Sequence, residues 1–313
     1  MSCPVAIVFP GQGSQHLKML SQGSILELAK SSEYKYLTEL CSDLISLDFL
    51  DLVENGPEDS LNQTSITQPV LLLTSYFHYQ NLIRKIDLEP LIFAGHSLGE
   101  YSALIAANSI SIDDGLKLVH KRGLLMEDAP KGSMAAILGL DISSIEQLCL
   151  EVSIDESMQV QCANINSPSQ TVISGSNEAV AITQELCLKA GAKRAIALKV
   201  SIASHSPLMK SVQDEYITFL STIEINLPRV TVLHNVNHGP CSESNDIRNL
   251  LVQQLYSPVQ WVKICKEISG LGAPVIECGP GKVLGGLFKA NGVNDYFSTS
   301  DSNFYEKILT HVK

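Results

Sequence analysis

The pattern Gly-x-Ser-x-Gly at residues 95–99 is the feature that most constrains what this chain can fold into. An apolar run at 91–94 precedes it, and an alanine- and leucine-rich run at 101–107 follows it. This setting predicts a strand, a sharp turn and a helix, with Ser97 in the turn. The turn needs glycines on both sides of the serine, because larger side chains would collide with the strand and the helix. The hydroxyl is then presented at a helix N-terminus, where the N–H of Leu98 is free to stabilise an oxyanion.

Length and composition favour a large buried core. The chain has 313 residues, of which 45% are hydrophobic, and a formal net charge of −11. We expect one large domain with an insertion, or two domains, and the negative charge argues against a nucleic-acid surface. The apolar runs are too short to span a membrane. The eight cysteines are far apart and include no Cys-x-x-Cys, which predicts reduced thiols rather than disulfides or a metal site.

Residues 5–9 are the first predicted strand, and a second glycine-containing turn follows them. It contains Gly11, Gln12 and Gly13, but His16 stands where a dinucleotide-binding loop has its third glycine. A nucleotide site is therefore not expected. Gln12 is better interpreted as a polar group that lines a cleft at the carboxyl end of the strand, with a solvated turn as the alternative.

Arg122 lies on the apolar face of a predicted helix that begins near Asp113. It follows Leu118 by four positions and Val119 by three, so it shares their side of the helix. An arginine that faces a core needs a negatively charged partner. The pattern leaves two partners open, namely a carboxylate of the chain in a buried ion pair or a bound ligand.

The order of the predicted elements changes at residue 133. From 133 to 200 the pattern predicts strand, helix, strand, strand, helix and strand, which is the order of a ferredoxin-like unit. Strands alternate with helices on both sides of this segment, which predicts an α/β domain with a mostly parallel sheet. We expect residues 1–132 and 201–313 to form this large domain, with 133–200 as an inserted subdomain. His205 follows the point where the insertion rejoins the large domain, so it should lie beside a cleft.

Five stretches of the chain, taken together, resemble the malonyl-CoA:acyl-carrier-protein transacylases. In order they are FPGQGSQ (9–15), GHSLGEY (95–101), RG (122–123), QLYSPVQW (254–261) and GPGKVL (279–284). The resemblance covers essentially the whole chain and implies a hydrolase-like α/β domain with a ferredoxin-like subdomain and the site between them. It also implies that a malonyl group passes from malonyl-CoA to the phosphopantetheine thiol of acyl carrier protein, through a malonyl-serine intermediate, in fatty acid synthesis.

The resemblance assigns the central chemistry to a pair of residues. Ser97 corresponds to the nucleophile, and His205 corresponds to the base that deprotonates Ser97 and later the carrier thiol. The backbone carbonyl of Gln254 corresponds to the group that holds the other ring nitrogen of the histidine, so no third acid is required. The resemblance implies no metal and no tightly bound cofactor, since coenzyme A and phosphopantetheine enter as parts of substrates.

The resemblance also implies how the substrate is held. Gln12 and the N–H of Leu98 correspond to the oxyanion hole, and Arg122 corresponds to the residue that binds the free carboxylate of the malonyl group. A guanidinium binds a carboxylate through two parallel hydrogen bonds, and an acetyl group would leave it unpaired. Ala203 stands where the family often has proline, and a similar Ala-Ser-His sequence occurs in relatives that accept methylmalonyl groups. Methylmalonyl-CoA therefore remains an alternative donor.

The acyl carrier protein of this family is acidic, as this chain is. Docking therefore requires a local basic patch. Lys189, Lys193 and Arg194 are the candidates, with ordinary solvated charges as the alternative interpretation. We otherwise expect a cytoplasmic monomer that binds neither nucleic acid nor a membrane.

Two other functions fit part of the sequence. A serine hydrolase would combine Ser97 with Asp246 and His311, but it leaves the insertion and Arg122 unexplained. A docking protein that binds an acyl carrier without transferring an acyl group would not need both Ser97 and His205.

Overall fold

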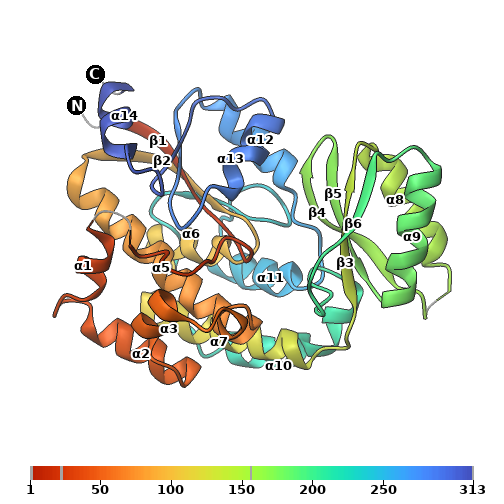
Figure 1. The fold of residues 1–313 in the computed structure, drawn as a ribbon, viewed down its shortest axis with the longest axis horizontal. Coiled ribbons are helices and arrows are strands. Elements are labelled where there is room, and N and C mark those ends of the chain that lie inside the picture. The colour runs from red at the N-terminus through yellow and green to blue at the C-terminus, as the bar shows by residue number, and fades with distance from the viewer. Residues whose placement is uncertain (1–2, 22–23, 156, 312–313) are drawn as a thin grey trace.

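The computed structural model describes residues 3–21, 24–155 and 157–311. They form two lobes, each built on a sheet of its own (Figure 1). The large lobe contains a five-stranded parallel sheet, and the small lobe contains a four-stranded antiparallel sheet. The predicted fold class, an α/β domain with a mostly parallel sheet and a ferredoxin-like unit, is confirmed.

The large sheet has the strand order β7-β2-β1-β8-β9. Its strands are β1 (Cys3–Phe9), β2 (Leu88–Gly95), β7 (Thr231–Leu233), β8 (Val275–Glu277) and β9 (Tyr296–Ser298). The parallel register pairs Phe9 with Gly95, the last residues of β1 and β2. The turns that follow these two strands therefore lie at the same edge of the sheet, where ligand sites of open α/β sheets form.

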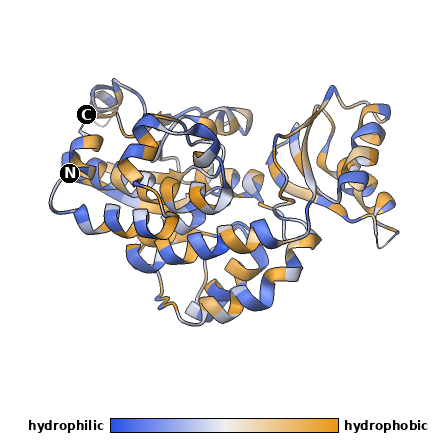
Figure 2. Cartoon of the chain, turned by 60° about the horizontal axis from the view of Figure 1, so that its bottom comes forward, coloured by the Kyte–Doolittle hydropathy of each residue, from blue (hydrophilic) through white to orange (hydrophobic). Residues whose placement is uncertain are grey.

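Helices cover both faces of the large sheet. In chain order they are α1 (Ile25–Ala29), α2 (Lys35–Ile45), α3 (Phe49–Asn55), α4 (Glu58–Leu61), α5 (Thr64–Lys85), α6 (Gly99–Ala106), α7 (Ile112–Asp128), the 3₁₀ helix η1 (Pro207–Val212), α10 (Gln213–Leu220), α11 (Ser244–Gln254), α12 (Trp261–Gly270), α13 (Val283–Ala290) and α14 (Phe304–His311). Hydrophobic and hydrophilic residues alternate along the outer helices (Figure 2), which is typical of helices that pack on a core by one face.

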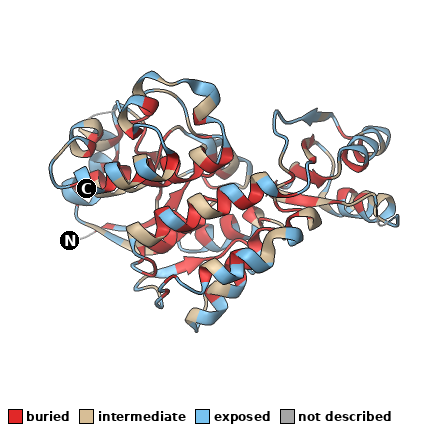
Figure 3. Ribbon diagram, turned by 90° about the horizontal axis from the view of Figure 1, so that it is seen from below, coloured by how far each residue is buried: buried red, intermediate tan, exposed pale blue. Residues whose placement is uncertain are grey.

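The two faces of β1 belong to two different apolar clusters. Val5, Ile7 and Phe9 pack into the larger cluster, with residues of α5, α6 and α7. Ala6 and Val8 pack into a second cluster, with residues of α12 and α13. This alternation is the two-residue period of a strand buried on both sides. The buried residues accordingly concentrate in the middle of the large lobe (Figure 3).

The small lobe has the strand order β4-β5-β3-β6, and all its neighbouring strands are antiparallel. Its elements are β3 (Ser133–Leu138), α8 (Ile142–Val152), β4 (Val160–Ser167), β5 (Gln170–Gly175), α9 (Asn177–Lys189) and β6 (Arg194–Ala197). The two helices lie on the side of the small sheet that faces away from the large lobe (Figure 1). The lobes are joined by backbone hydrogen bonds, since Val259 donates to Ala163 at 2.8 Å and accepts from Ile165 at 2.9 Å.

All eight cysteines lie within the described ranges, and none forms a disulfide. In the part of the chain that the structure describes, no helix has both the length and the apolar composition that a membrane span requires.

The contact between α5 and α7 leaves no room for a side chain at Gly123. A Cβ there would lie 2.6 Å from the Cα of Ser65 and 2.9 Å from the carbonyl oxygen of Thr64. We expect Gly123→Ala to lower the free energy of unfolding by about 1–3 kcal/mol, because backbone atoms would have to move. Urea denaturation measures this change.

Gly286→Ala is the matched control, since Gly286 also lies in a helix, α13. A Cβ there meets no atom of the described residues within 4 Å. This variant should match the parent or gain up to about 1 kcal/mol, because alanine favours a helix over glycine. Equal stabilities for the two variants would contradict the close packing of α5 on α7.

Candidate active site

Ser97 lies in a sharp turn between β2 and α6. Its φ angle is 50°, in the left-handed region that side chains seldom adopt. A Cβ on Gly95 would lie 1.9 Å from the backbone carbon of Gly99, and a Cβ on Gly99 would lie 2.2 Å from the carbonyl oxygen of Phe9. Both glycines are therefore required by the close approach of α6 to the ends of β1 and β2.

The structure brings His205 to this turn. Its Nε2 atom lies 2.7 Å from the Oγ atom of Ser97. Its Nδ1 atom donates a hydrogen bond to the backbone carbonyl of Gln254, with a separation of 2.6 Å. A proton on Nδ1 leaves Nε2 as the acceptor, so Ser97 donates its hydroxyl proton toward the ring.

His205 is buried, with 2% of its surface exposed. Burial, together with the nearby charge of Arg122, lowers its pKa to about 3. The imidazole is therefore neutral at pH 7, which is the form that can accept a proton from a serine.

Arg122 reaches the same site from α7, and its side chain is buried. It donates hydrogen bonds to the side-chain oxygens of Gln68 at 2.8 Å and Gln254 at 3.0 Å, and its Nη2 atom also donates, at 3.5 Å, to the Oγ of Ser97. Its Nε atom has no hydrogen-bond partner among the described residues.

Arg122 takes part in none of the ion pairs found in the described ranges. The sequence left two partners open for Arg122, a carboxylate of the chain or a bound ligand. The described residues supply no such carboxylate, which leaves the ligand. A buried guanidinium that donates only to neutral oxygens has unused capacity for an anion.

The two residues expected at the oxyanion hole differ in their placement. The N–H of Leu98 has no hydrogen-bond acceptor among the residues that the structure describes. Gln12 lies beside the serine turn, because its neighbour Gly11 packs so tightly that a Cβ would meet the carbonyl oxygen of His96 at 2.3 Å. The Gln12 side chain is exposed, however, and donates to the hydroxyl of Thr64 at 3.1 Å.

Asn235 holds the serine turn in place, and sequence reasoning missed it. Its Oδ1 atom accepts a hydrogen bond from the backbone N–H of Ser97 at 2.7 Å, and its Nδ2 atom donates to the carbonyl of Gly95 at 2.7 Å. Asn235 follows β7, the strand beside β2, but nothing in its local sequence distinguishes it from an ordinary loop asparagine.

Glu100 is a buried carboxylate behind the site, and sequence reasoning missed it as well. It accepts hydrogen bonds from the side chain of Gln254 at 2.6 Å, the backbone N–H of Asn235 at 3.1 Å and the Nδ1 atom of His234 at 2.8 Å. The available signal was a glutamate in the first turn of the apolar helix α6.

The small lobe contributes two side chains from β4. Gln161 donates to the backbone carbonyls of His205 at 2.6 Å and Tyr256 at 2.7 Å. The Oδ1 atom of Asn166 lies 2.9 Å from the Nε2 atom of His96, the residue before the serine. The site therefore lies where the two lobes meet.

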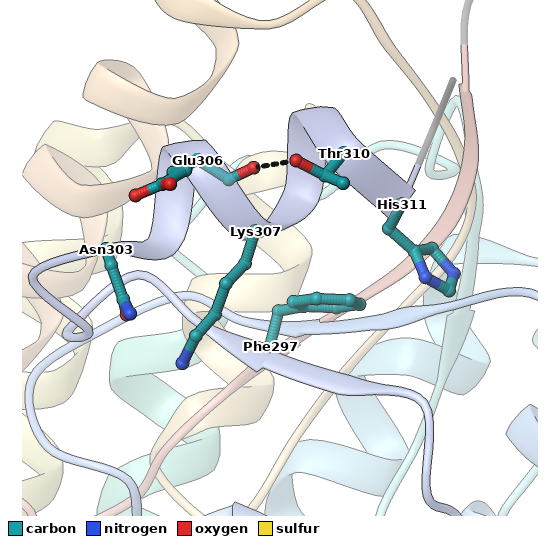
Figure 4. A pocket seen from close by; sticks show the side chains of 6 residues that line it. All are labelled: Phe297, Asn303, Glu306, Lys307, Thr310 and His311. Carbon is teal, nitrogen blue, oxygen red and sulfur yellow. Dashed lines mark hydrogen bonds between the residues drawn. The ribbon is translucent and has the colours of Figure 1, made fainter.

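His311, the base of the serine hydrolase alternative, has a different environment. Its Nε2 atom lies 2.9 Å from a carboxylate oxygen of Asp295, and its ring packs at a tilt against Phe297 with centroids 5.2 Å apart. Figure 4 shows this ring at the end of α14, beside an open surface pocket. Because His205 and not His311 bonds to Ser97, the hydrolase triad is not supported.

A profile of the acyl transferase domain matches residues 6–282. The chain belongs to the acyl transferase family. The malonyl CoA-acyl carrier protein transacylase of Haemophilus influenzae is 44% identical over 292 residues, which are 91% of each chain. That of Escherichia coli strain K12 is 42% identical over 291 residues, again 91% of each chain.

Solved structures of acyl transferases agree with this membership. The malonyl CoA-acyl carrier protein transacylase of Coxiella burnetii superposes with a TM-score of 0.91 at 36% identity, covering 100% of this chain and 98% of that one. A malonyl-transacylase solved in complex with its type II PKS acyl-carrier protein has a TM-score of 0.89 at 38% identity, covering 99% and 100% of the two chains. The resemblance to the malonyl-CoA:acyl-carrier-protein transacylases, which the sequence predicted, is confirmed.

The low pKa of His205, about 3, makes the fold sensitive to acid. Below the ordinary histidine value of about 6.5, the unfolded chain binds a proton that the folded chain does not, so stability is lost as the pH falls. Between pH 7 and pH 5 this loss amounts to about 2 kcal/mol. We expect the His205→Gln variant to lack this loss of stability. Urea denaturation at pH 7 and at pH 5 measures the free energy of unfolding at each pH.

His16→Gln is the matched control, because His16 is an exposed histidine. Its stability should fall with acid as steeply as that of the parent protein. If stability fell equally with acid in His205→Gln and in His16→Gln, His205 would have similar pKa values in the folded and unfolded chains.

Proposed function

We propose that this chain transfers a malonyl group from malonyl-CoA to the phosphopantetheine thiol of an acyl carrier protein, and so supplies fatty acid synthesis. One observation carries the proposal: a buried Arg122, free of any carboxylate partner among the described residues, lies 3.5 Å from a serine hydroxyl that is bonded to a neutral histidine. The named activity of the similar proteins, malonyl CoA-acyl carrier protein transacylase, supports it.

In the proposed loading step, Ser97 attacks the thioester carbonyl of malonyl-CoA while Nε2 of His205 takes the hydroxyl proton. The carbonyl oxygen becomes an oxyanion, which the free N–H of Leu98 stabilises. When the tetrahedral intermediate collapses, the carbon–sulfur bond breaks and His205 returns the proton to the sulfur of coenzyme A. The enzyme then carries a malonyl-serine ester.

The second half of the reaction reverses these steps with a different thiol. His205 takes the proton of the carrier's phosphopantetheine thiol, and the sulfur attacks the ester carbonyl. Ser97 leaves with the proton from His205, and the malonyl thioester of the carrier is released. The carbonyl of Gln254 keeps the ring in the required tautomer throughout, so a dyad suffices.

Gln12 is the second donor of the proposed oxyanion hole. Its exposed amide bonds to Thr64 at 3.1 Å, so it has to leave that hydroxyl when a substrate carbonyl enters. The exchange replaces one exposed hydrogen bond by a charge-assisted one, which is about twice as strong.

Arg122 gives the proposed site its selectivity. The malonyl carboxylate would pair with the guanidinium in a dry site, whereas an acetyl group would leave the buried charge without a partner, at a cost of about 3 kcal/mol. Methylmalonyl-CoA carries the same carboxylate and remains an alternative donor, so it belongs in the test.

We further propose that the chain is divided as the sequence suggests, with residues 133–200 as a ferredoxin-like subdomain inserted between 1–132 and 201–313. The antiparallel sheet of the small lobe, which uses strands from Ser133 to Ala197, supports this division. The cytoplasmic location and the monomeric state stay predictions.

The direct test is to mix the purified protein with malonyl-CoA, without a carrier, and to record its intact mass. We expect a malonyl adduct that is absent in Ser97→Ala and present in Ser269→Ala, where an exposed serine is changed. Acetyl-CoA should give at least about tenfold less adduct, because a methyl group cannot pair with Arg122. Methylmalonyl-CoA is tested in parallel to rank the two carboxylate donors.

Arg122→Ala separates the nucleophile from the selectivity filter. This variant should lower malonyl loading by about a hundredfold, and it should reduce the preference for malonyl-CoA over acetyl-CoA. The exposed Arg229→Ala should do neither. Equal labelling by the two donors in the parent protein would contradict the role of Arg122, and rapid hydrolysis of simple esters would favour a hydrolase.

Docking of an acidic carrier protein is proposed at Lys189, Lys193 and Arg194, all of which are exposed in the small lobe. The solved complex of a related malonyl-transacylase with its acyl-carrier protein supports a carrier as the partner. Reversing these three charges to glutamate should raise the KM for the carrier about tenfold at low salt and leave loading from malonyl-CoA unchanged. Reversal of the charges of Lys266 and Lys289 in the large lobe is the control. An unchanged KM for the carrier at low salt in the triple variant would contradict docking at the small lobe.

A further inference from the structure

An aromatic ring lies against the guanidinium of Arg122. Tyr101 belongs to the first turn of α6, four residues after Ser97, and its side chain is fully buried. The Cζ atom of Arg122 lies over this ring, 5.5 Å from the ring centroid. The ring therefore faces a buried cation in a place that water does not reach.

A second tyrosine fixes the position of this ring. The hydroxyls of Tyr101 and Tyr216 share a hydrogen bond at 2.6 Å. Tyr216 belongs to α10, and its side chain is also fully buried. Burial raises the pKa of both phenols, so both are neutral at pH 7. Tyr101 therefore offers Arg122 the face of a ring and no negative charge.

An aromatic face and a carboxylate affect a buried arginine differently. A carboxylate would pair with the N–H groups of the guanidinium and neutralise its charge. An aromatic face attracts the cation and supplies no counter-charge. Gln68 and Gln254 accept hydrogen bonds from Arg122 at 2.8 Å and 3.0 Å, and both acceptors are neutral as well. The guanidinium is thus held in place while its charge stays available to a ligand.

We propose that Tyr101 is a positioning residue that sets the acyl selectivity of the site, because its ring holds the guanidinium of Arg122 where the carboxylate of an acyl group at Ser97 can pair with it. The binding of a carboxylate is a property of the protein alone, whereas the link to malonyl transfer rests on the proposed function.

Loss of the ring should change Arg122 more than Ser97. Leucine fills less space than tyrosine and has no negative face, so the guanidinium would lose both packing and attraction. Its Nη2 atom lies 3.5 Å from the Oγ of Ser97, so a small displacement changes where a paired carboxylate lies relative to the nucleophile. Ser97 and His205 keep their own hydrogen bonds to Asn235 and Gln254. Selectivity for a carboxylate should therefore fall further than the reactivity of the serine.

The first experiment measures carboxylate binding without using enzyme activity. Malonamate, which carries one carboxylate and one amide, is titrated into the folded protein in a calorimeter, with neutral malonamide as the ligand control. Tyr101→Leu should weaken malonamate binding about tenfold, because a desolvated cation loses its aromatic partner. Tyr101→Phe retains the ring and should bind within about twofold of the parent. Equal affinities in the parent and Tyr101→Leu, an equal loss in Tyr101→Phe, or a parent that does not prefer malonamate to malonamide would overturn the proposal.

Tyr34→Leu is the matched control. Tyr34 is buried in the same apolar cluster and contacts a different arginine, since the Cζ atom of Arg84 lies 5.3 Å from its ring centroid. Arg84 belongs to the last turn of α5, at the other end of that helix from Gln68. This variant loses a contact of the same kind, and it should bind malonamate as the parent does. A loss as large as that of Tyr101→Leu would contradict the proposal, because it would trace the effect to a missing core ring.

Pentafluorophenylalanine at position 101 tests the charge of the ring at nearly constant shape. The fluorine atoms withdraw electrons from the ring face and remove its attraction for a cation. This protein should bind malonamate about fivefold more weakly than Tyr101→Phe, and the comparison decides the proposal even where Tyr101→Leu does not fold. Equal affinities of the two aromatic variants would contradict a role for the ring face.

The second experiment connects Tyr101 to acyl transfer. Loading of Ser97 from malonyl-CoA and from acetyl-CoA is followed by intact mass. Tyr101→Leu should lower the ratio of the malonyl rate to the acetyl rate about tenfold in the parent, but not in the Arg122→Ala background, because the ring acts through Arg122. An equal fall in both backgrounds would overturn the positioning role. Failure of the parent to load malonyl would overturn the proposed function, and the titration would still decide whether Tyr101 supports Arg122.

Discussion

The hydrogen bonds of Gln254 connect His205, Arg122 and Glu100 with the backbone of Ser97. Its backbone carbonyl accepts from Nδ1 of His205, and its side-chain amide donates to the backbone carbonyl of Ser97 and to Glu100. Its side-chain oxygen accepts from Arg122. One buried glutamine at the end of α11 therefore fixes the tautomer of a histidine, the turn of a serine and the direction of a guanidinium. Any shift of this residue reaches all three, which makes the site a single unit.

Two buried charges of opposite sign lie on either side of this glutamine, and they do not form an ion pair. Glu100 is satisfied by the side chain of Gln254, by the backbone N–H of Asn235 and by the ring of His234. Arg122 donates only to neutral oxygens, those of the Gln68 and Gln254 amides and of the Ser97 hydroxyl. A salt bridge between them would neutralise the arginine and remove its affinity for an external carboxylate. Keeping Glu100 behind the glutamine balances the charge of the region and leaves the arginine open toward Ser97.

The fold and part of the site could be predicted from the sequence, because their signals are local. The serine turn is defined by glycines two positions away, and Arg122 is marked by the period of its own helix. Asn235, Glu100 and Gln161 were missed, because their partners lie on other elements and no local pattern points to them. The direction of the Gln12 side chain could not be predicted from its neighbours in the sequence either. It donates a hydrogen bond to Thr64, at the start of a helix that lies much later in the chain.

The position of the base depends on both lobes. His205 belongs to the segment that returns from the small lobe, and its φ angle of 57° is strained. Its N–H donates to the carbonyl of Leu255 in the large lobe, while its own carbonyl accepts from Gln161 in the small lobe. The strained backbone is thus held from two sides by elements that do not share a core. The distance between Nε2 of His205 and Oγ of Ser97 therefore depends on the packing of both lobes, and not on the large lobe alone.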